Sequence, residues 1–374
     1  MDNKYGLVIY KDTTNIGDDI QSYAAACLLP QIDYIIDREN TDTFSSDHGE
    51  PVKAIMNGWY MHQKWNWPPS KDIIPTFFAF NYSEESYFYY DKYMKSTFLE
   101  GEGQTYLNQW GPIGCRDLDT QRLLEERGIP AFFSGCLTLT LPRNIPEKPG
   151  NYICIVDIEQ EAEALITKQA RSEGMQVKKI THSIPKYEEG TPWSVRESKV
   201  KELLALYQNA RCVVTCRLHC ALPCLAMGVP VLLVRPDMDD KRFQPYVDWM
   251  ETATPRQIAA GQFPFSFANP PQNAEKHIPF RERMIREIRA FLNCPVQPLP
   301  ARDEQAIRTW QMQTMKALLE ASLAHALTLA QKANAPKPHY KDVVLRQFAS
   351  GQVGLRYIAK YFLAWLRYKL RRKN

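Results

Sequence analysis

Short apolar runs alternate with longer helical patterns in two parts of the chain. In the first part, the runs at 5–10, 34–36, 113–116 and 131–133 have the length and composition of buried strands. Helical patterns at 20–29 and 117–127 stand between them and end at Pro30 and Gly128. This strand–helix–strand order favours a parallel sheet.

The same alternation returns after residue 150. It predicts strands at 152–158, 177–181, 212–215 and 231–234, and helices at 159–172, 194–209 and 221–227. Between the two parts, the segment 142–150 contains three prolines and a glycine, which is typical of an interdomain linker. Residues 278–292 and 304–332 are predicted to be helical, and the aromatic segment 40–110 has no pattern that assigns its elements.

We therefore predict an α/β protein with two Rossmann-like domains facing a cleft. The predicted boundaries are 1–148 for the N-terminal domain, 149–295 for the C-terminal domain and 296–374 for a helical extension.

Composition narrows the protein class without naming a function. The 374 residues are 44% hydrophobic and 24% charged, which is globular composition with enough apolar material for about two domains. No apolar run approaches the roughly 18 residues of a membrane span, and the first residues do not resemble a secretory signal. Nine cysteines without small-domain spacing predict free thiols and a cytoplasmic protein.

Positive charge is concentrated at the C-terminal end. Eight of the 46 basic residues and no acidic residue lie within 343–374, which leaves 38 basic against 42 acidic residues elsewhere. The basic character therefore belongs to a tail on a slightly acidic body, and we expect no nucleic-acid partner.

The stretch 211–234 contains the most informative polar residues. Arg217 and His219 directly follow a predicted buried strand and precede a helix, where open α/β sheets bind ligands. A helix N-terminus there favours phosphate, an arginine binds anions through its planar fork, and a histidine transfers protons near neutral pH. The two side chains share a site only if 217–219 form the turn between strand and helix. A structural Arg–acid pair and a helix-capping histidine remain the alternative.

Two other segments have polar residues at or after the carboxyl end of a predicted strand. The loop after the first strand contains Asn15, Gly17, Asp18 and Asp19, followed by Gln21. Either aspartate is a candidate general base or sugar ligand, and an ordinary N-cap is the alternative. Arg116 ends a strand of the first part, and its side chain either faces the cleft or pairs with a neighbouring acid.

Four cysteines recur every four residues, at positions 212, 216, 220 and 224. Zinc sites prefer short Cys-x-x-Cys pairs in turns, so we predict buried packing thiols and no metal site. The sequence also has no P-loop, no G-x-G-x-x-G and no nucleophile elbow.

Several motifs together resemble one known family. The run 213–234 combines an apolar strand, Thr, Arg-x-His, a helix of small residues and Gly-x-Pro-Val; NIGDDIQ at 15–21, IGCRDLDTQRLLEERGI at 113–129 and THSIP at 181–185 accompany it. Over about residues 5–235 the chain resembles the polysaccharide pyruvyltransferases. One departure is Gly135-Cys136, where the family typically has Asp-Pro.

This resemblance implies a GT-B-like fold with the acceptor on the N-terminal domain and the donor on the C-terminal domain. It also implies transfer from phosphoenolpyruvate onto two sugar hydroxyls, forming a pyruvate ketal during cell-surface polysaccharide synthesis without a cofactor. Arg217, Arg116, Arg242 and Lys241 are then expected to bind the donor, and His219 to be the acid. Asp18 or Asp19 is expected to be the base, and Asn15, Gly17 and Gln21 to contact the acceptor.

The C-terminal tail predicts an interfacial helix. At about 100° per residue, 355–371 forms one apolar and one basic face, as in helices that lie in a membrane surface. The expected membrane contacts are Phe362, Trp365, Arg367 and Arg371, which place the protein at the inner face of the membrane beside a lipid-linked acceptor. The alternative is a helix docked on the acidic body of the protein itself.

Two other functions fit the same sequence features. One is a GT-B glycosyltransferase in which Arg217 neutralises the diphosphate of a nucleotide-activated sugar. The other is a non-catalytic, membrane-bound organiser of glycan assembly, which would not need His219.

Overall fold

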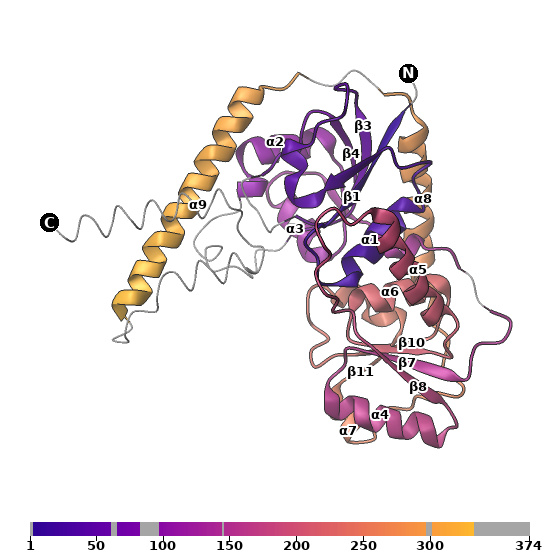
Figure 1. The fold of residues 1–374 in the computed structure, drawn as a ribbon. Coiled ribbons are helices and arrows are strands. Elements are labelled where there is room, and N and C mark those ends of the chain that lie inside the picture. The colour runs from indigo at the N-terminus through magenta and orange to yellow at the C-terminus, as the bar shows by residue number, and fades with distance from the viewer. Residues whose placement is uncertain (1–2, 61–65, 83–96, 144–145, 297–300, 333–374) are drawn as a thin grey trace.

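The computed structural model describes residues 3–60, 66–82, 97–143, 146–296 and 301–332. Within them, two parallel sheets are stacked with helices between them and on their outer faces (Figure 1). The predicted α/β class is therefore confirmed. The Rossmann-like character of each half, the cleft and the domain boundaries stay predictions.

The first sheet has the strand order β2-β1-β3-β4-β5-β6. All five neighbouring pairs are parallel. Its strands are β1 (Lys4–Ile9), β2 (Tyr34–Asp37), β3 (Val52–Trp59), β4 (Ile73–Asn81), β5 (Ile113–Cys115) and β6 (Ala131–Phe133). Since parallel strands run in one direction, the residues that follow them gather at one edge of the sheet.

The second sheet has the order β11-β10-β9-β7-β8 and is also parallel throughout. Its strands are β7 (Tyr152–Val156), β8 (Gln176–Ile180), β9 (Val213–Thr215), β10 (Val231–Val234) and β11 (Glu251–Ala253).

A layer of helices fills the space between the sheets. It contains α1 (Ile16–Ala26), α5 (Trp193–Gln208) and α6 (Leu218–Met227), which Figure 1 shows between the strands above and below. One continuous apolar cluster joins the facing sides of both sheets through this layer, including Leu7 of β1, Ile20 of α1 and Leu233 of β10. The two sheets therefore share a core.

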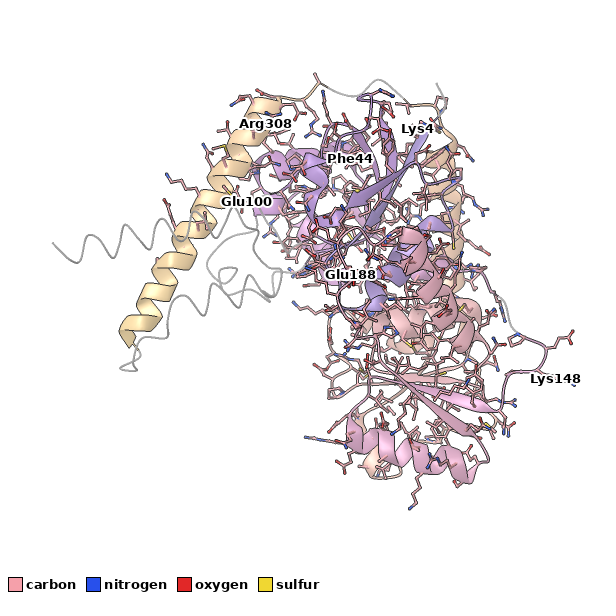
Figure 2. The ribbon with its side chains drawn as sticks, in the orientation of Figure 1. Lys4, Phe44, Glu100, Lys148, Glu188 and Arg308 are labelled. Atoms are coloured by element: carbon pink, nitrogen blue, oxygen red, sulfur yellow. The ribbon has the colours of Figure 1, made fainter. Side chains whose placement is uncertain are left out.

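The outer faces have separate cores. The first sheet is covered by α2 (Gly101–Trp110) and α3 (Leu118–Glu125), and the second by α4 (Gln160–Ser172) and α7 (Pro255–Ala259). The exposed Lys148 stands on a segment that projects from the body between the two halves of the chain (Figure 2).

Two helices follow the second sheet. Helix α8 (Ile278–Asn293) returns to the first sheet, where the buried amine of Lys53 donates to the carbonyls of Phe291, at 2.8 Å, and Leu292, at 3.0 Å. Helix α9 (Glu304–Lys332) contacts α2, and Trp310 lies over Gly101. No helix in the described part of the chain has the length and hydropathy needed to cross a membrane.

The predicted helix starts at Ile20 and Ala221 are wrong. Helix α1 begins at Ile16 because the Asn15 side chain caps it, accepting from Gly17 N at 3.0 Å. Asp18 and Asp19 thus belong to the first turn of a helix, where acidic side chains oppose the helix dipole. Helix α6 begins at Leu218, directly after Arg217. Both corrections bring helix N-termini to the carboxyl edges of the strands.

Candidate active site

The carboxyl edges of the two sheets meet beside the start of α1. The loop after β1 pairs with the loop after β8: Ile16 N donates to the His182 carbonyl at 2.9 Å, and Ile184 N donates to the Thr14 carbonyl at 2.8 Å. On another side, the Tyr246 hydroxyl donates to the carbonyl of Arg116. Residues from both halves of the chain therefore lie around the start of α1.

Arg217 lies in the turn between β9 and α6, and His219 lies in the first turn of α6 rather than in the strand-to-helix turn that the sequence analysis required. Arg217 is the N-cap residue of α6, but no side chain caps the first helical turn. His219 has a non-helical backbone conformation (φ −82°, ψ 15°) inside this first turn. The uncapped N–H groups at the start of α6 give this turn a partial positive charge, which favours the binding of an anion.

His219 is held against the start of α1. A Cβ atom at Gly17 would lie 3.1 Å from the His219 Cβ, so a larger residue there would require His219 to shift. The side chain is buried, and its Nε2 has no hydrogen-bond partner. Burial lowers the pKa of His219 well below its usual value, and the positive charges of Arg116 and Arg242 lower it further.

Arg116 is 3% exposed and bonded on two sides. Its guanidinium donates to Gln21 Oε1 at 3.2 Å and to Asn81 Oδ1, while its Nε has no partner. Burial, together with the nearby charge of Arg242, lowers the pKa of Arg116 from its ordinary value. Of the two alternatives for Arg116, the acidic partner is not found: neutral amides bind its guanidinium, and no ion pair in the described part of the chain cancels its charge.

Arg217 lies nearer the solvent, with 42% of its side chain exposed. Its Nε donates to Asp157 Oδ2 at 2.9 Å. No hydrogen bond within the described residues engages its two terminal nitrogens. The predicted alternative, an Arg–acid pair, is thus present, yet half of the guanidinium is available to another anion.

Two other predicted donor ligands lie on the loop after β10. Lys241 forms an ion pair with Asp119 of α3 at 3.2 Å. The exposed Arg242 is close enough to act electrostatically on both Arg116 and His219. Arg242 therefore joins the cluster, whereas the charge of Lys241 is partly compensated.

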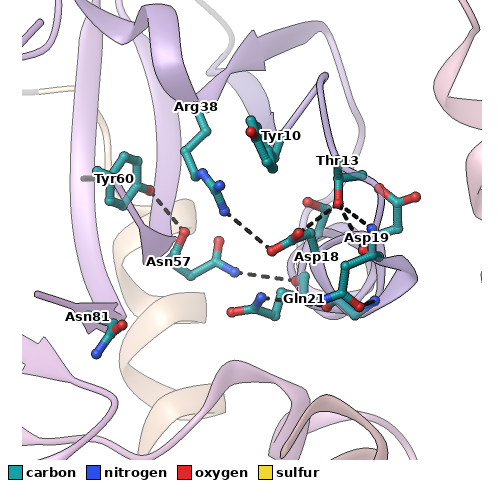
Figure 3. Close-up of polar contacts among 12 residues, drawn as sticks. Tyr10, Thr13, Asp18, Asp19, Gln21, Arg38, Asn57, Tyr60 and Asn81 are labelled. Atoms are coloured by element: carbon teal, nitrogen blue, oxygen red, sulfur yellow. Dashed lines mark hydrogen bonds and ion pairs between the residues drawn. The ribbon is translucent and has the colours of Figure 1, made fainter. Parts of the chain in front are cut away.

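The two candidate bases have different surroundings. Asp19 is fully buried in an ion pair with Arg196 of α5, and it also accepts from the Tyr187 hydroxyl at 2.9 Å. Asp18 is partly exposed: its Oδ2 accepts from Thr13 at 2.7 Å, and its Oδ1 is 3.5 Å from Arg38 Nη1 (Figure 3). Only Asp18 has an oxygen that a substrate can approach.

Among the residues expected to contact the acceptor, Gln21 is buried and positions Arg116, whereas Asn15 is occupied as the cap of α1. Gly17 contacts His219 through its backbone. The four expected membrane contacts, Phe362, Trp365, Arg367 and Arg371, lie outside the described residues.

Three site residues were missed by the sequence patterns. Arg38 follows β2, Asn57 lies near the end of β3, and Asn81 ends β4. Arg38 comes two residues after the predicted strand at 34–36, so the rule that selected Arg116 could also have indicated it. Asn57 and Asn81 belong to strands that no sequence pattern assigned.

The cysteine prediction is confirmed for three thiols. Cys212, Cys220 and Cys224 are buried, while Cys216 is half-buried and donates to the Asp157 carbonyl at 2.6 Å. A surface pocket of about 280 Å³ lies between Ala210 and Pro230, at the amino-terminal edge of the second sheet, and contains none of the predicted residues.

Comparison with known proteins identifies a family. A family model described as polysaccharide pyruvyl transferase matches residues 15–238, more than half of the chain. No curated protein matches the sequence. A solved structure of a functionally uncharacterised protein from Klebsiella pneumoniae subsp. pneumoniae NTUH-K2044 is similar at 13% identity and a TM-score of 0.39. The similarity covers 66% of this chain and 88% of that one.

Proposed function

Because this chain belongs to the polysaccharide pyruvyl transferase family, we propose that it moves the pyruvyl group of phosphoenolpyruvate onto two hydroxyls of one sugar. The product is a cyclic pyruvate ketal, and inorganic phosphate is released. The observation that carries this proposal is the buried, unpartnered Nε2 of His219 beside the charge of Arg116 and the uncapped N-terminus of α6.

The donor is a small molecule with a phosphate and a carboxylate. In this proposal the phosphate lies at the first turn of α6, where backbone N–H groups and Arg217 compensate its charge. Arg116 and Arg242 provide the positive potential for the carboxylate. Lys241 contributes less, because it is already paired with Asp119.

His219 donates the first proton. Without a bound anion it is neutral, since burial and two arginines disfavour its charge. The negative donor reverses this balance and raises the pKa of His219, so that its proton can pass to the methylene carbon C3 of phosphoenolpyruvate. A cationic centre then develops at C2.

The two hydroxyls attack C2 in turn. The first forms a C–O bond and releases its proton to Asp18, and the C2–O bond to phosphate then breaks. The second hydroxyl forms the other C–O bond and returns a proton to His219. The proton returned to His219 replaces the one that it gave to C3. The proton on Asp18 leaves with phosphate, so the reaction balances without a redox step.

Mass spectrometry tests this function directly. The purified protein is incubated with phosphoenolpyruvate and a panel of synthetic and lipid-linked glycosides. We expect a glycoside that gains the mass of a pyruvate ketal, together with stoichiometric release of phosphate. If nucleotide sugars stabilise the protein in a thermal-shift assay and phosphoenolpyruvate does not, the donor assignment is wrong.

A further inference from the structure

The pairing of β3 with β4 is irregular beside Asn57, at the carboxyl edge of the first sheet. The pairing of β3 with β4 runs from Met56 opposite Phe77 to Gly58 opposite Phe80, so that β4 has one residue more than β3 at this point. Ala79, inside the irregularity, has the left-handed φ of 57°. Such bulges bend a strand and are frequent beside active sites.

Asn57 is 5% exposed, and its Oδ1 has no hydrogen-bond partner. Its Nδ2 donates to the Gln21 carbonyl at 3.3 Å, and its own carbonyl accepts from the Tyr60 hydroxyl at 3.0 Å. The residue is thus fixed on two sides while one buried acceptor is left unsatisfied. An unmade buried hydrogen bond is destabilising, so a ligand that donates to this oxygen would remove the penalty.

Arg38 and Asp18 face the same space (Figure 3). The guanidinium of Arg38 lies 4.2 Å from the centre of the Tyr10 ring, and its Nη1 is 3.5 Å from Asp18 Oδ1. A Cβ atom at Gly58 would lie 3.6 Å from the same Nη1, so this nitrogen is beside the residue that follows Asn57. Arg38 thus contacts Asp18 and approaches the backbone that follows Asn57, and we call these three residues the Arg38 cluster.

We propose that the Arg38 cluster binds the two acceptor hydroxyls of a hexopyranoside, an inference that rests on the proposed function. A hydroxyl group both donates and accepts hydrogen bonds. Asp18 Oδ1 accepts from the hydroxyl that attacks first, Asn57 Oδ1 accepts from its neighbour, and the guanidinium of Arg38 donates to the sugar oxygens. Gly17 and Gln21 join this cluster to His219 and Arg116, which brings the diol to the reacting carbon.

The test measures sugar binding separately from turnover. Dissociation constants for the methyl glycosides of galactose, glucose and mannose are obtained by saturation-transfer NMR for the wild type, Asn57→Leu and Asp18→Asn. Asp12→Asn is the matched control, because Asp12 lies in the same loop but pairs with Lys186 at the surface. Asn40→Ala is a second control, since the Asn40 side chain donates to Asp37 Oδ2 at 2.7 Å, outside the Arg38 cluster.

We expect at least one glycoside to bind the wild type, and binding to weaken at least tenfold in both cluster variants and in neither control. Asn57→Leu removes an unsatisfied oxygen but also the hydrogen bond from Nδ2 to the Gln21 carbonyl, so its melting temperature should stay close to that of the wild type. Phosphoenolpyruvate binding should be unchanged in Asn57→Leu. The proposal is overturned if no glycoside binds the wild type, or if both cluster variants bind as the wild type does.

The outcomes separate this proposal from the proposed function. If the cluster variants lose glycoside binding but no ketal ever forms, the sugar site stands and the transfer reaction is wrong. If ketal forms and the acceptor KM is unchanged in both variants, the transfer stands and the sugar site lies elsewhere.

Discussion

In the structure without a bound anion, the lowered pKa of His219 favours the neutral imidazole over the imidazolium. Burial and the neighbouring arginines make the imidazolium costly, while the orphan Nε2 leaves one ring nitrogen ready for a ligand. In the proposed function, the bound anionic donor gives this residue its charge. Its contribution should therefore be visible in turnover more than in binding.

We predict that His219→Gln lowers kcat about 100-fold or more, because a positioned general acid contributes roughly that factor. The amide keeps a polar group near Gly17, so the fold and the affinity for phosphoenolpyruvate should be retained. Steady-state kinetics and thermal-shift titration measure the two effects. Normal turnover in a folded His219→Gln protein would exclude the acid role.

Arg217 should act on the donor's affinity. Losing a charge-assisted contact costs about 1.5–3 kcal/mol, so Arg217→Ala should bind phosphoenolpyruvate about tenfold to a hundredfold more weakly. Arg217→Lys should be impaired too, since an ammonium cannot hold Asp157 and an anion with one planar fork. Arg143→Ala, which removes an exposed ion pair with Glu275, is the control. Unchanged donor affinity in Arg217→Ala would place the donor elsewhere.

The depressed pKa of His219 also predicts how stability depends on pH. Unfolded His219 binds a proton near its ordinary pKa of about 6.5, whereas the folded residue does so only well below it. Stability should therefore fall as the pH drops below about 6.5, by up to about 1.4 kcal/mol per pH unit for this residue. His277 acts in the same direction because burial lowers its pKa.

Urea unfolding between pH 8 and pH 5 measures this dependence. The His219→Gln variant should lose less stability on acidification than the wild type. Equal losses in the two proteins would mean that His219 binds its proton as easily in the folded chain as in the unfolded one.

At the scale of elements, a buried ion pair between Asp19 and Arg196 connects α1 to α5. The carboxylate of Asp19 is surrounded by Arg196 and Tyr187, and Arg196 Nε donates to Asp19 at 3.0 Å. Asp19→Ala should reduce the free energy of unfolding by about 3–5 kcal/mol, because it leaves the charge of Arg196 buried and unpaired. Asp18→Asn, one residue away, should change it by less than about 1 kcal/mol.

Chemical denaturation of both variants checks this difference. Steady-state kinetics of the same variants then decides between the two candidate bases, because Asp19 is expected to act on stability and Asp18 on turnover. A stable Asp19→Ala protein without activity would contradict this assignment.

Elements were predictable where apolar runs end at clear breaks. The strands at 131–133 and 231–234 and the helix at 304–332 have the predicted bounds. Strand β3 was missed because the buried Lys53 interrupts its apolar pattern. The amine of Lys53 is satisfied by carbonyls at the end of α8, a partner more than 200 residues away that no local pattern reveals.

The candidate site was predictable only in part from the sequence. The rule that ligands gather at the carboxyl ends of parallel strands selected Arg116 and His219, which the fold brings together. It could not select Asn57, whose position depends on the irregular pairing of β3 and β4. It also could not separate Asp18 from Asp19, because their difference arises from Arg196, on a distant helix.

At the scale of the whole molecule, the tail 343–374 remains a sequence prediction. Its eight basic residues and apolar stripe should bind anionic membranes, at roughly 1 kcal/mol per basic residue near the surface. A protein ending at Lys337 should stay folded and keep activity on a soluble acceptor, but no longer sediment with anionic liposomes. If the full-length protein does not sediment at low salt, the tail has another role.

The start of β1 and the end of α8 meet at the surface. Asn3 Nδ2 donates to the carbonyls of Leu292, at 3.0 Å, and Cys294, at 3.1 Å. The two ends of the body formed by residues 3–294 thus lie side by side, and the exposed, projecting segment at Lys148 is a place where the chain can be opened. A circular permutant that links 294 to 3 and starts at Lys148 should preserve the shared core and the site, while the order in which the ribosome delivers the two sheets is reversed.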